Sequence, residues 1–181
     1  MIIKLGRHFT RLLDRIEAGM PQITILNTGE ELLDGRVVNT NASTISGMLF
    51  ENGFSTAQAV MVGDGVDAIS ACLRDALSKA DVVIMTGGLG PTEDDRTAEA
   101  ISQVINAPIR RSREALAQID AYYAKTGRVM PDSNAKQANI PLTARLMGAS
   151  FGTAPGFWVP YHSKVVVALP GVPKEMSGLM K

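Results

Sequence analysis

The sequence contains a single cysteine, carries no net charge and has no apolar run long enough to cross a membrane. One cysteine excludes an intramolecular disulfide, so the fold depends on its core rather than on cross-links. A membrane-spanning helix needs about 20 consecutive apolar residues, and the lack of such a run indicates a soluble, cytoplasmic protein. The 18 basic residues balance the 18 acidic ones, which leaves no overall field to attract nucleic acid or an anionic membrane. We therefore expect neither as a partner.

Two local features that often signal chemistry are predicted to be structural here. Cys72 falls on the apolar side of a predicted helix, which indicates a core thiol. The basic run 110–113 is the only candidate for a positive patch, and we interpret it as the solvated start of a helix. His8 and His162 are isolated from every glycine or acidic motif, so we expect neither in catalysis.

From Gln22 onward, apolar strand-like runs alternate with helical patterns. This alternation is typical of βαβ units and of a mostly parallel sheet. The pattern changes near the end of the chain, where the apolar runs 157–159 and 164–169 flank a turn and predict an antiparallel hairpin. The sequence predicts strands over 22–27, 56–62 and 81–85, helices over about 41–52, 66–77, 95–106 and 112–125, and a short polar helix between Pro131 and Pro141.

The chain is long enough for one domain, and 45% of its 181 residues are hydrophobic, which suffices for a substantial core. Residues 1–19 mix apolar and basic side chains and differ from the rest. Because Met20 and Pro21 directly precede the first predicted strand, we interpret 1–19 as an N-terminal extension and 20–181 as the domain.

A glycine-rich loop follows the apolar run 81–85. Gly87, Gly88 and Gly90 can adopt positive φ and carry no Cβ, so successive backbone N–H groups can converge on a phosphate. A helix predicted to start near Asp95 would add its positive end. No Gly-Lys-Ser/Thr follows these glycines, and the Gly-x-Gly-x-x-Gly spacing is incomplete. Neither a Walker A loop nor a dinucleotide fingerprint is therefore indicated.

Two aspartates follow the loop. Asp94 and Asp95 would repel a phosphate unless a divalent cation lies between them, so the segment predicts a site for a phosphorylated ligand with a hard metal such as Mg²⁺. The alternative is structural. Thr92 and Asp95 have the spacing of a capping box, and helix starts favour acidic residues in any case.

Two further turns follow apolar strands, at 28–31 and 169–175. In an open parallel sheet such turns meet at the carboxyl ends of the strands, where ligands bind, so one pocket can be built from all three loops. Glu30 and Glu31 could complete a metal site with the aspartates or position a water molecule, or they could form a solvated turn. Asn39 and Asn41 could contact the ligand, although Asn41 has the position of a helix N-cap.

Four segments in order, 28–41, 86–97, 152–157 and 169–176, resemble the N-terminal domain of competence/damage-inducible protein A (CinA). More broadly the chain is similar to the molybdopterin-binding (MoaB/Mog-type) superfamily. The resemblance extends from Met20 to Lys181. It implies a three-layer α/β/α sandwich with a pocket for a nucleotide or pterin phosphate.

The resemblance also implies roles for individual residues. Asp95 matches the family's metal-associated aspartate and Asp94 the first of an aspartate pair, so both are predicted metal ligands for Mg²⁺, Mn²⁺ or Co²⁺. They are also predicted to be catalytic, together with Glu31. The predicted substrate-binding residues are Thr28, Gly29, Glu30, Asn39, Asn41, Thr86, Gly87, Gly88, Gly90, Pro91, Thr97, Gly152, Thr153, Pro170, Gly171 and Pro173.

Three functions follow from this resemblance as alternatives. CinA proteins are associated with ADP-ribose pyrophosphatase activity, which makes metal-dependent hydrolysis of a nucleotide pyrophosphate the leading prediction. The second is an adenylyltransferase that activates molybdopterin in molybdenum cofactor biosynthesis. The third is a binding module that holds a nucleotide or pterin without turnover. We expect a homo-oligomer, either a dimer or a trimer.

Overall fold

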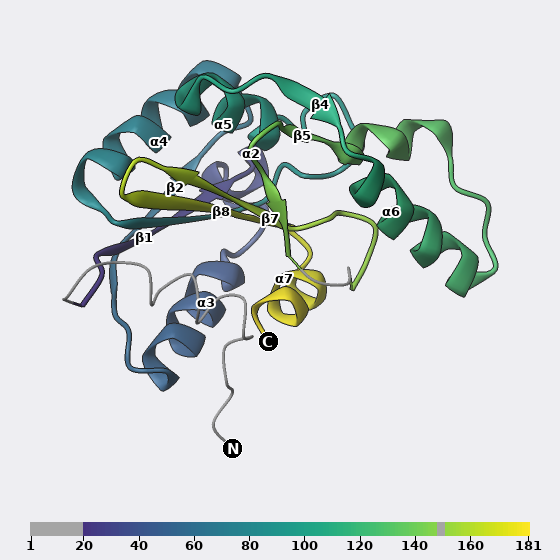
Figure 1. Ribbon diagram of the computed structural model, residues 1–181. Coiled ribbons are helices and arrows are strands. Elements are labelled where there is room, and N and C mark those ends of the chain that lie inside the picture. Colours follow the sequence, from purple (N-terminus) through teal and green to yellow (C-terminus); the bar gives the residue numbers. More distant parts are fainter. Residues whose placement is uncertain (1–19, 148–150) are drawn as a thin grey trace.

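The computed structural model describes residues 20–147 and 151–181 (Figure 1). The predicted extension 1–19 lies outside this range. No helix of the described ranges is long and apolar enough to cross a membrane.

One six-stranded sheet, in the order β2-β1-β3-β8-β7-β6, forms the centre of the fold. β1 (Ile23–Thr28), β2 (Thr56–Val62), β3 (Val82–Thr86) and β8 (Lys164–Leu169) run parallel. β7 (Phe157–Tyr161) and β6 (Arg145–Leu146) continue the sheet in antiparallel pairs. The predicted parallel sheet and C-terminal hairpin are confirmed.

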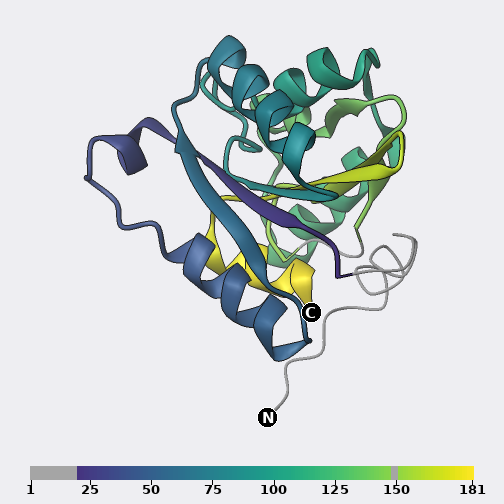
Figure 2. The same ribbon diagram turned by 90° about the vertical axis from the view of Figure 1, so that its left-hand side faces the viewer.

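Helices cover both faces of the sheet (Figure 1, Figure 2). α4 (Val66–Lys79) and α5 (Thr97–Ile105) pack on one face, and α3 (Thr40–Glu51) and α7 (Pro173–Met180) on the other. β1 and β3 are buried along their whole length, which fits the apolar run of β3, whereas β1 also buries the polar residues Thr24, Asn27 and Thr28. The three-layer α/β/α sandwich is therefore present. A short helix, α2 (Glu30–Leu33), follows β1.

The segment between α5 and β6 forms a small extra unit beside the sandwich. β4 (Ile109–Arg111) pairs antiparallel with β5 (Asn139–Pro141), and α6 (Arg113–Thr126) and the 3₁₀ helix η1 (Asp132–Ala138) lie between them in the chain. The basic run 110–113 thus starts in a strand rather than a helix, because Arg110 and Arg111 pair with β5. Ser112 is the N-cap of α6 and accepts a hydrogen bond from Ala115 N.

Cys72 is half-buried and packs against the core cluster between the sheet and α4. Burial, with a smaller contribution from the nearby charge of Asp75, raises the pKa of its thiol. A raised pKa disfavours the reactive thiolate, in agreement with the prediction of a core thiol.

Candidate functional site

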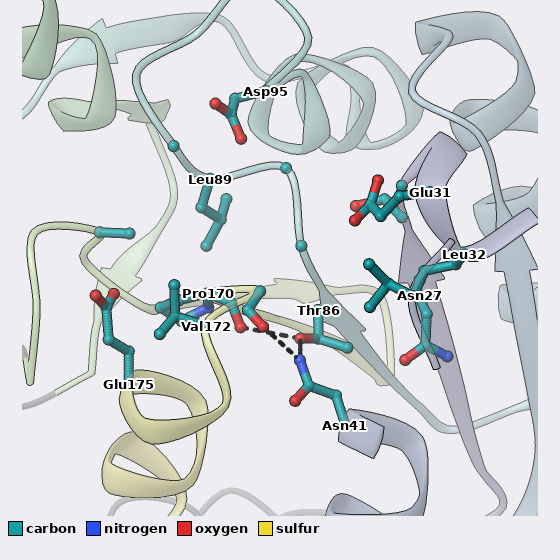
Figure 3. Close-up of a pocket in the computed structure, with 18 of the residues that line it drawn as sticks. Asn27, Glu31, Leu32, Asn41, Thr86, Leu89, Asp95, Pro170, Val172 and Glu175 are labelled. Atoms are coloured by element: carbon teal, nitrogen blue, oxygen red, sulfur yellow. Dashed lines mark hydrogen bonds between the residues drawn. The ribbon is translucent and has the colours of Figure 1, made fainter. Parts of the chain in front are cut away.

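The predicted loops meet at the carboxyl ends of β1, β3 and β8, where they enclose a pocket of about 530 Å³. Side chains from β1, α2, α3, β3, the glycine-rich loop and α7 surround it (Figure 3). Of the predicted site residues, all line this pocket except Glu30, Thr97 and Gly152. The prediction that separate loops build one pocket is confirmed.

The glycine-rich loop adopts the predicted positive φ at Gly87 and Gly88 but not at Gly90. Gly87 and Gly88 have positive φ values of 102° and 64°, which disfavour any residue with a Cβ. Gly87 N donates to Leu169 O at 3.1 Å, so this N–H belongs to the sheet and not to a ligand site. The N–H groups of Gly88, Leu89 and Gly90 have no hydrogen-bond acceptor among residues 20–147 and 151–181. They are the donors left for an anion.

The hydroxyl groups of Thr28 and Thr97 support this loop through hydrogen bonds. Thr97 Oγ1 donates to Gly87 O at 2.9 Å, which leaves Thr28 Oγ1 as the donor in the 3.3 Å contact between the two hydroxyls. A Cβ on Gly88 would lie 2.3 Å from Thr97 Oγ1. The missing side chain at Gly88 therefore makes room for Thr97 of α5 and not for a ligand. Thr97 is fully buried and does not line the pocket. It was predicted to contact the substrate, but in the structure it supports the loop.

The acidic turn beside the loop has a defined geometry. Asp95 Oδ2 accepts hydrogen bonds from Thr92 N at 2.9 Å and from Thr92 Oγ1 at 2.7 Å. α5 begins at Thr97 and not near Asp95, so this pair closes a turn ahead of the helix and is not a capping box. Asp94 is exposed and lines the same pocket as Asp95.

Two adjacent glutamates diverge. The carboxylate of Glu31 folds over Gly29 and lines the pocket. Glu30 turns away, and its Oε1 accepts a hydrogen bond from Asp64 N at 3.3 Å while its own N–H donates to Asp64 Oδ2 at 3.1 Å. Glu30 therefore does not line the pocket and instead joins α2 to the loop after β2. Asp64, which was not predicted, lines the pocket in its place.

Asn39 and Asn41 both line the pocket, but the helix cap is Asn39 and not Asn41 as predicted. Asn39 is the N-cap of α3 and accepts from Ala42 N at 3.1 Å. Asn41 lies inside the first turn, and its Nδ2 donates to Thr86 Oγ1 at 3.0 Å and to Gly171 O at 2.8 Å (Figure 3). Thr86 Oγ1 in turn donates to Pro170 O at 2.9 Å. These bonds join α3, β3 and the loop before α7 into one pocket floor.

Asn27 was not predicted to belong to the site. It is 1% exposed and lines the pocket at the end of β1, and its Nδ2 donates to Val60 O at 3.0 Å. This bond fixes the orientation of the amide, and the buried Oδ1 has no partner among the described residues; the same is true of Asn41 Oδ1. A polar residue at the end of a buried apolar strand was the signal available in the sequence.

Glu175 also lines the pocket and was missed, although it belongs to the 169–176 segment. Burial raises the pKa of its carboxyl, and a hydrogen bond from the backbone of Ala154 opposes that rise. A Cβ on Gly152 would lie 1.8 Å from Glu175 Oε1. Gly152 does not line the pocket, and its lack of a side chain makes room for Glu175.

The carboxylates do not gather into a complete metal site. No group of three or more His, Cys, Asp or Glu side chains within the described ranges could hold a metal ion. Asp94, Asp95 and Glu31 nevertheless line one pocket with the unpaired N–H groups of the glycine-rich loop. Such a surface offers both donors for an anion and carboxylates for a cation bound with it.

Residues 24–181 match the family model described as "Probable molybdopterin binding domain". The chain is similar to the crystal structure of CinA from Thermoplasma acidophilum, described as a protein of unknown function. That match has 38% sequence identity and a TM-score of 0.80, and it covers 87% of this chain and 93% of the other.

MoaB, a molybdopterin biosynthesis enzyme from a Thermus species, has the same fold. The TM-score is 0.59 at 19% identity, over 88% of this chain and 87% of that chain. Identity this low supports the likeness of fold alone.

A CinA-like protein from Anaeromyxobacter dehalogenans is 39% identical over 158 residues, which cover 87% of this chain and 39% of the relative. The chain thus spans about two fifths of the length of that curated relative. It belongs to the molybdopterin-binding domain family and, within that family, to the CinA-like proteins.

Proposed function

We propose that this domain hydrolyses a nucleotide pyrophosphate, of which ADP-ribose is the leading candidate, with the help of a divalent metal. The observation that carries the proposal is a run of three N–H groups, at Gly88, Leu89 and Gly90, that have no acceptor in the described part of the chain and lie beside two aspartates in one pocket. N–H donors alone would suit any anion. Donors next to carboxylates suit a phosphate that arrives with a cation.

The residues present fit a metal of the Mg²⁺ type. This ion is commonly held by one or two carboxylates, with substrate phosphates and water completing its octahedron, so a full protein cage is not required. Asp94 and Asp95 would supply the protein ligands; Asp95 Oδ2 is engaged by Thr92, which holds the carboxylate in place. When bound, the metal would neutralise charge on the pyrophosphate and lower the pKa of a bound water.

The remaining groups have separate tasks in the proposed reaction. Water attacks one phosphorus, a new P–O bond forms and the bridging P–O bond breaks, so ADP-ribose yields AMP and ribose 5-phosphate. Glu31, whose carboxylate faces the pocket, accepts the proton of the attacking water. The N–H groups of Gly88, Leu89 and Gly90 stabilise charge that develops on the phosphate oxygens.

A turnover screen tests this proposal. ADP-ribose, ATP and related pyrophosphates are incubated with Mg²⁺, Mn²⁺ or Co²⁺, and release of AMP or phosphate is measured. We expect metal-dependent release of AMP from ADP-ribose, a strong loss in Glu31→Gln, and no change in Asp75→Asn, which removes an exposed carboxylate paired with Lys79 on α4. Equal rates in wild type and Glu31→Gln would remove the proposed base.

The family match supports a second candidate, transfer of AMP from ATP to a pterin phosphate. The amide oxygens of Asn27 and Asn41, which have no partner within residues 20–147 and 151–181, suit a ligand with several hydrogen-bond donors. A pterin ring shares this property with ribose. Formation of an adenylylated pterin with release of pyrophosphate would favour this candidate. Binding of either ligand without turnover would instead support the third alternative, a non-catalytic binding module.

We also propose that the domain assembles as a dimer or trimer. Light scattering during size-exclusion chromatography measures the mass directly, and a mass of one chain, 19.3 kDa, would contradict this.

A further inference from the structure

Gln137 lies in the short 3₁₀ helix η1, for which the sequence suggested no function. Its side chain is 7% exposed and reaches the pocket from the small unit beside the sandwich. Gln137 Nε2 donates to Leu89 O at 3.2 Å and to Thr153 Oγ1 at 3.3 Å. One amide group therefore joins the glycine-rich loop to the 152–156 segment.

The orientation of this amide is fixed by a third bond. Gln137 Oε1 accepts from Asn134 Nδ2 at 2.8 Å, so a flipped amide would place its oxygen against Leu89 O and its nitrogen against the Asn134 amide. Both N–H groups and the oxygen of Gln137 are thus engaged. A buried amide with all its partners in place specifies one arrangement of its neighbours.

Hydrogen bonds from η1 also reach the part of the glycine-rich loop that borders a second cavity. This cavity of about 200 Å³ lies on the other side of the loop, lined by Leu89, Lys136, Gln137 and Phe157 among others. Lys136 Nζ, also from η1, donates to Asp95 O at 3.0 Å and to Thr92 O. Hydrogen bonds from η1 therefore hold the loop and the acidic turn beside this cavity.

We propose that Gln137 is a positioning residue that couples the phosphate-binding loop to the 152–156 segment, so that neither wall of the pocket keeps its ligand-binding geometry without the other. The inference rests on the proposed function for its ligand, a phosphoanhydride. Its structural part stands on the contacts of Leu89, Gln137 and Thr153 alone. Gln137 acts through the loop and takes no part in the chemistry.

The ordering of the two walls can be measured without any substrate. Backbone ¹⁵N relaxation reports order parameters, which are about 0.85 for rigid amides and below about 0.6 for flexible ones. We expect rigid values for Gly88 to Gly90 and for Thr153 and Ala154 in the wild type, and a fall in both segments in Gln137→Leu. Ser70→Ala is the matched control, because it removes a buried hydroxyl that donates to Gln103 Oε1 at 2.8 Å, between α4 and α5. It should leave both segments ordered.

Thr153→Val provides a milder variant that tests coupling should Gln137→Leu fail to fold. It deletes only the bond from Gln137 to the 152–156 segment and retains the bond to Leu89. We expect the amide signals of Leu89 and Gly90 to shift in Thr153→Val, and AMP and inorganic pyrophosphate to bind about tenfold more weakly in both variants. Unchanged Leu89 signals in Thr153→Val, or an equal loss of order in Ser70→Ala, would overturn the inference.

The two proposals fail in different ways. A wild type that turns over no pyrophosphate but shows the coupled loss of order would reject the proposed function and keep the coupling. Normal turnover in the wild type, with unchanged order parameters in Gln137→Leu, would keep the proposed function and reject the coupling.

Discussion

The carboxylate of Asp95 lies directly against Gly90, where an added Cβ would come within 2.4 Å of Asp95 Oδ2. The φ angle of Gly90 is not positive, so the backbone there accepts other residues. A Cβ at Gly90 would therefore push against one carboxylate that can move, and this makes the contact a selective test of the aspartate.

Gly90→Ala should displace Asp95 while leaving the fold intact. A catalytic group displaced by about 1 Å can cost on the order of 100-fold in rate, so we expect kcat/KM to fall by about that factor. The melting temperature, followed by circular dichroism, should fall by only a few degrees. Full activity in Gly90→Ala would mean that Asp95 needs no fixed position.

Gly47→Ala is the control for the effect of alanine itself. Gly47 lies in the interior of α3, and a Cβ there meets nothing within 4 Å. Replacing glycine by alanine at such a helical position should stabilise the protein by about 0.5–1 kcal/mol. Urea unfolding measures this gain, and turnover should not change.

Asp95→Asn separates charge from structure at the same position. The amide oxygen can still accept the two hydrogen bonds from Thr92, so the turn should remain. Loss of the charge should lower kcat by about 100-fold or more if Asp95 holds a metal. A structural role alone would instead leave turnover normal and stability nearly unchanged, because the hydrogen bonds of the turn remain; thermal unfolding and the activity assay distinguish the two cases.

Glu175 predicts a pH-dependent stability. Burial raises the pKa of its carboxyl in the native state above the ordinary value of 4.5, which applies to the unfolded chain. At pH values between 4.5 and the raised pKa, the native state therefore binds more protons than the unfolded state. The contribution of Glu175 to stability therefore falls as the pH rises through this window and is constant above it. Glu175→Gln keeps an acceptor for the Ala154 N–H and has no charge to bury.

The difference in unfolding free energy between Glu175→Gln and wild type should accordingly shift in favour of the variant as the pH rises from about 4 to the raised pKa. Urea unfolding at several pH values checks this. A difference that does not vary with pH would show that the carboxyl is not perturbed by burial.

A chain that begins at Met20 should fold and bind ligand like the full sequence, because β1 and every pocket-lining residue lie beyond it. Thermal unfolding of both chains measures the effect. Loss of solubility, or a drop of several degrees in melting temperature, would mean that 1–19 packs on the core or on a partner subunit.

The sheet, its helices and most pocket residues could be predicted because each depends on a local pattern. The buried strand before Gly87 and the turn at Gly171 are examples. The choice between Asn39 and Asn41 as helix cap could not be predicted, because both side chains can cap a helix and they lie close together in the chain. The divergence of Glu30 from Glu31 depends on Asp64, a residue 34 positions away from Glu30.

The contribution of Gln137 was hidden for the same reason. Its partners Leu89 and Thr153 lie 48 and 16 residues away in the chain, and a glutamine in a polar segment carries no local signal. The positive φ of Gly88 was expected, but a second reason for glycine there, the approach of Thr97, appears only once α5 has packed against the loop.

The hydrogen bond from Gly87 N to Leu169 O extends the β3–β8 ladder by one residue into the glycine-rich loop. The entropy of ordering the first peptide of this loop is therefore lost when the domain folds and not when a ligand binds. A phosphate that reaches Gly88 to Gly90 therefore meets a loop whose first peptide the sheet already orders. Binding at this wall is thus expected to require little rearrangement of the backbone, so the free and bound loops should superimpose closely.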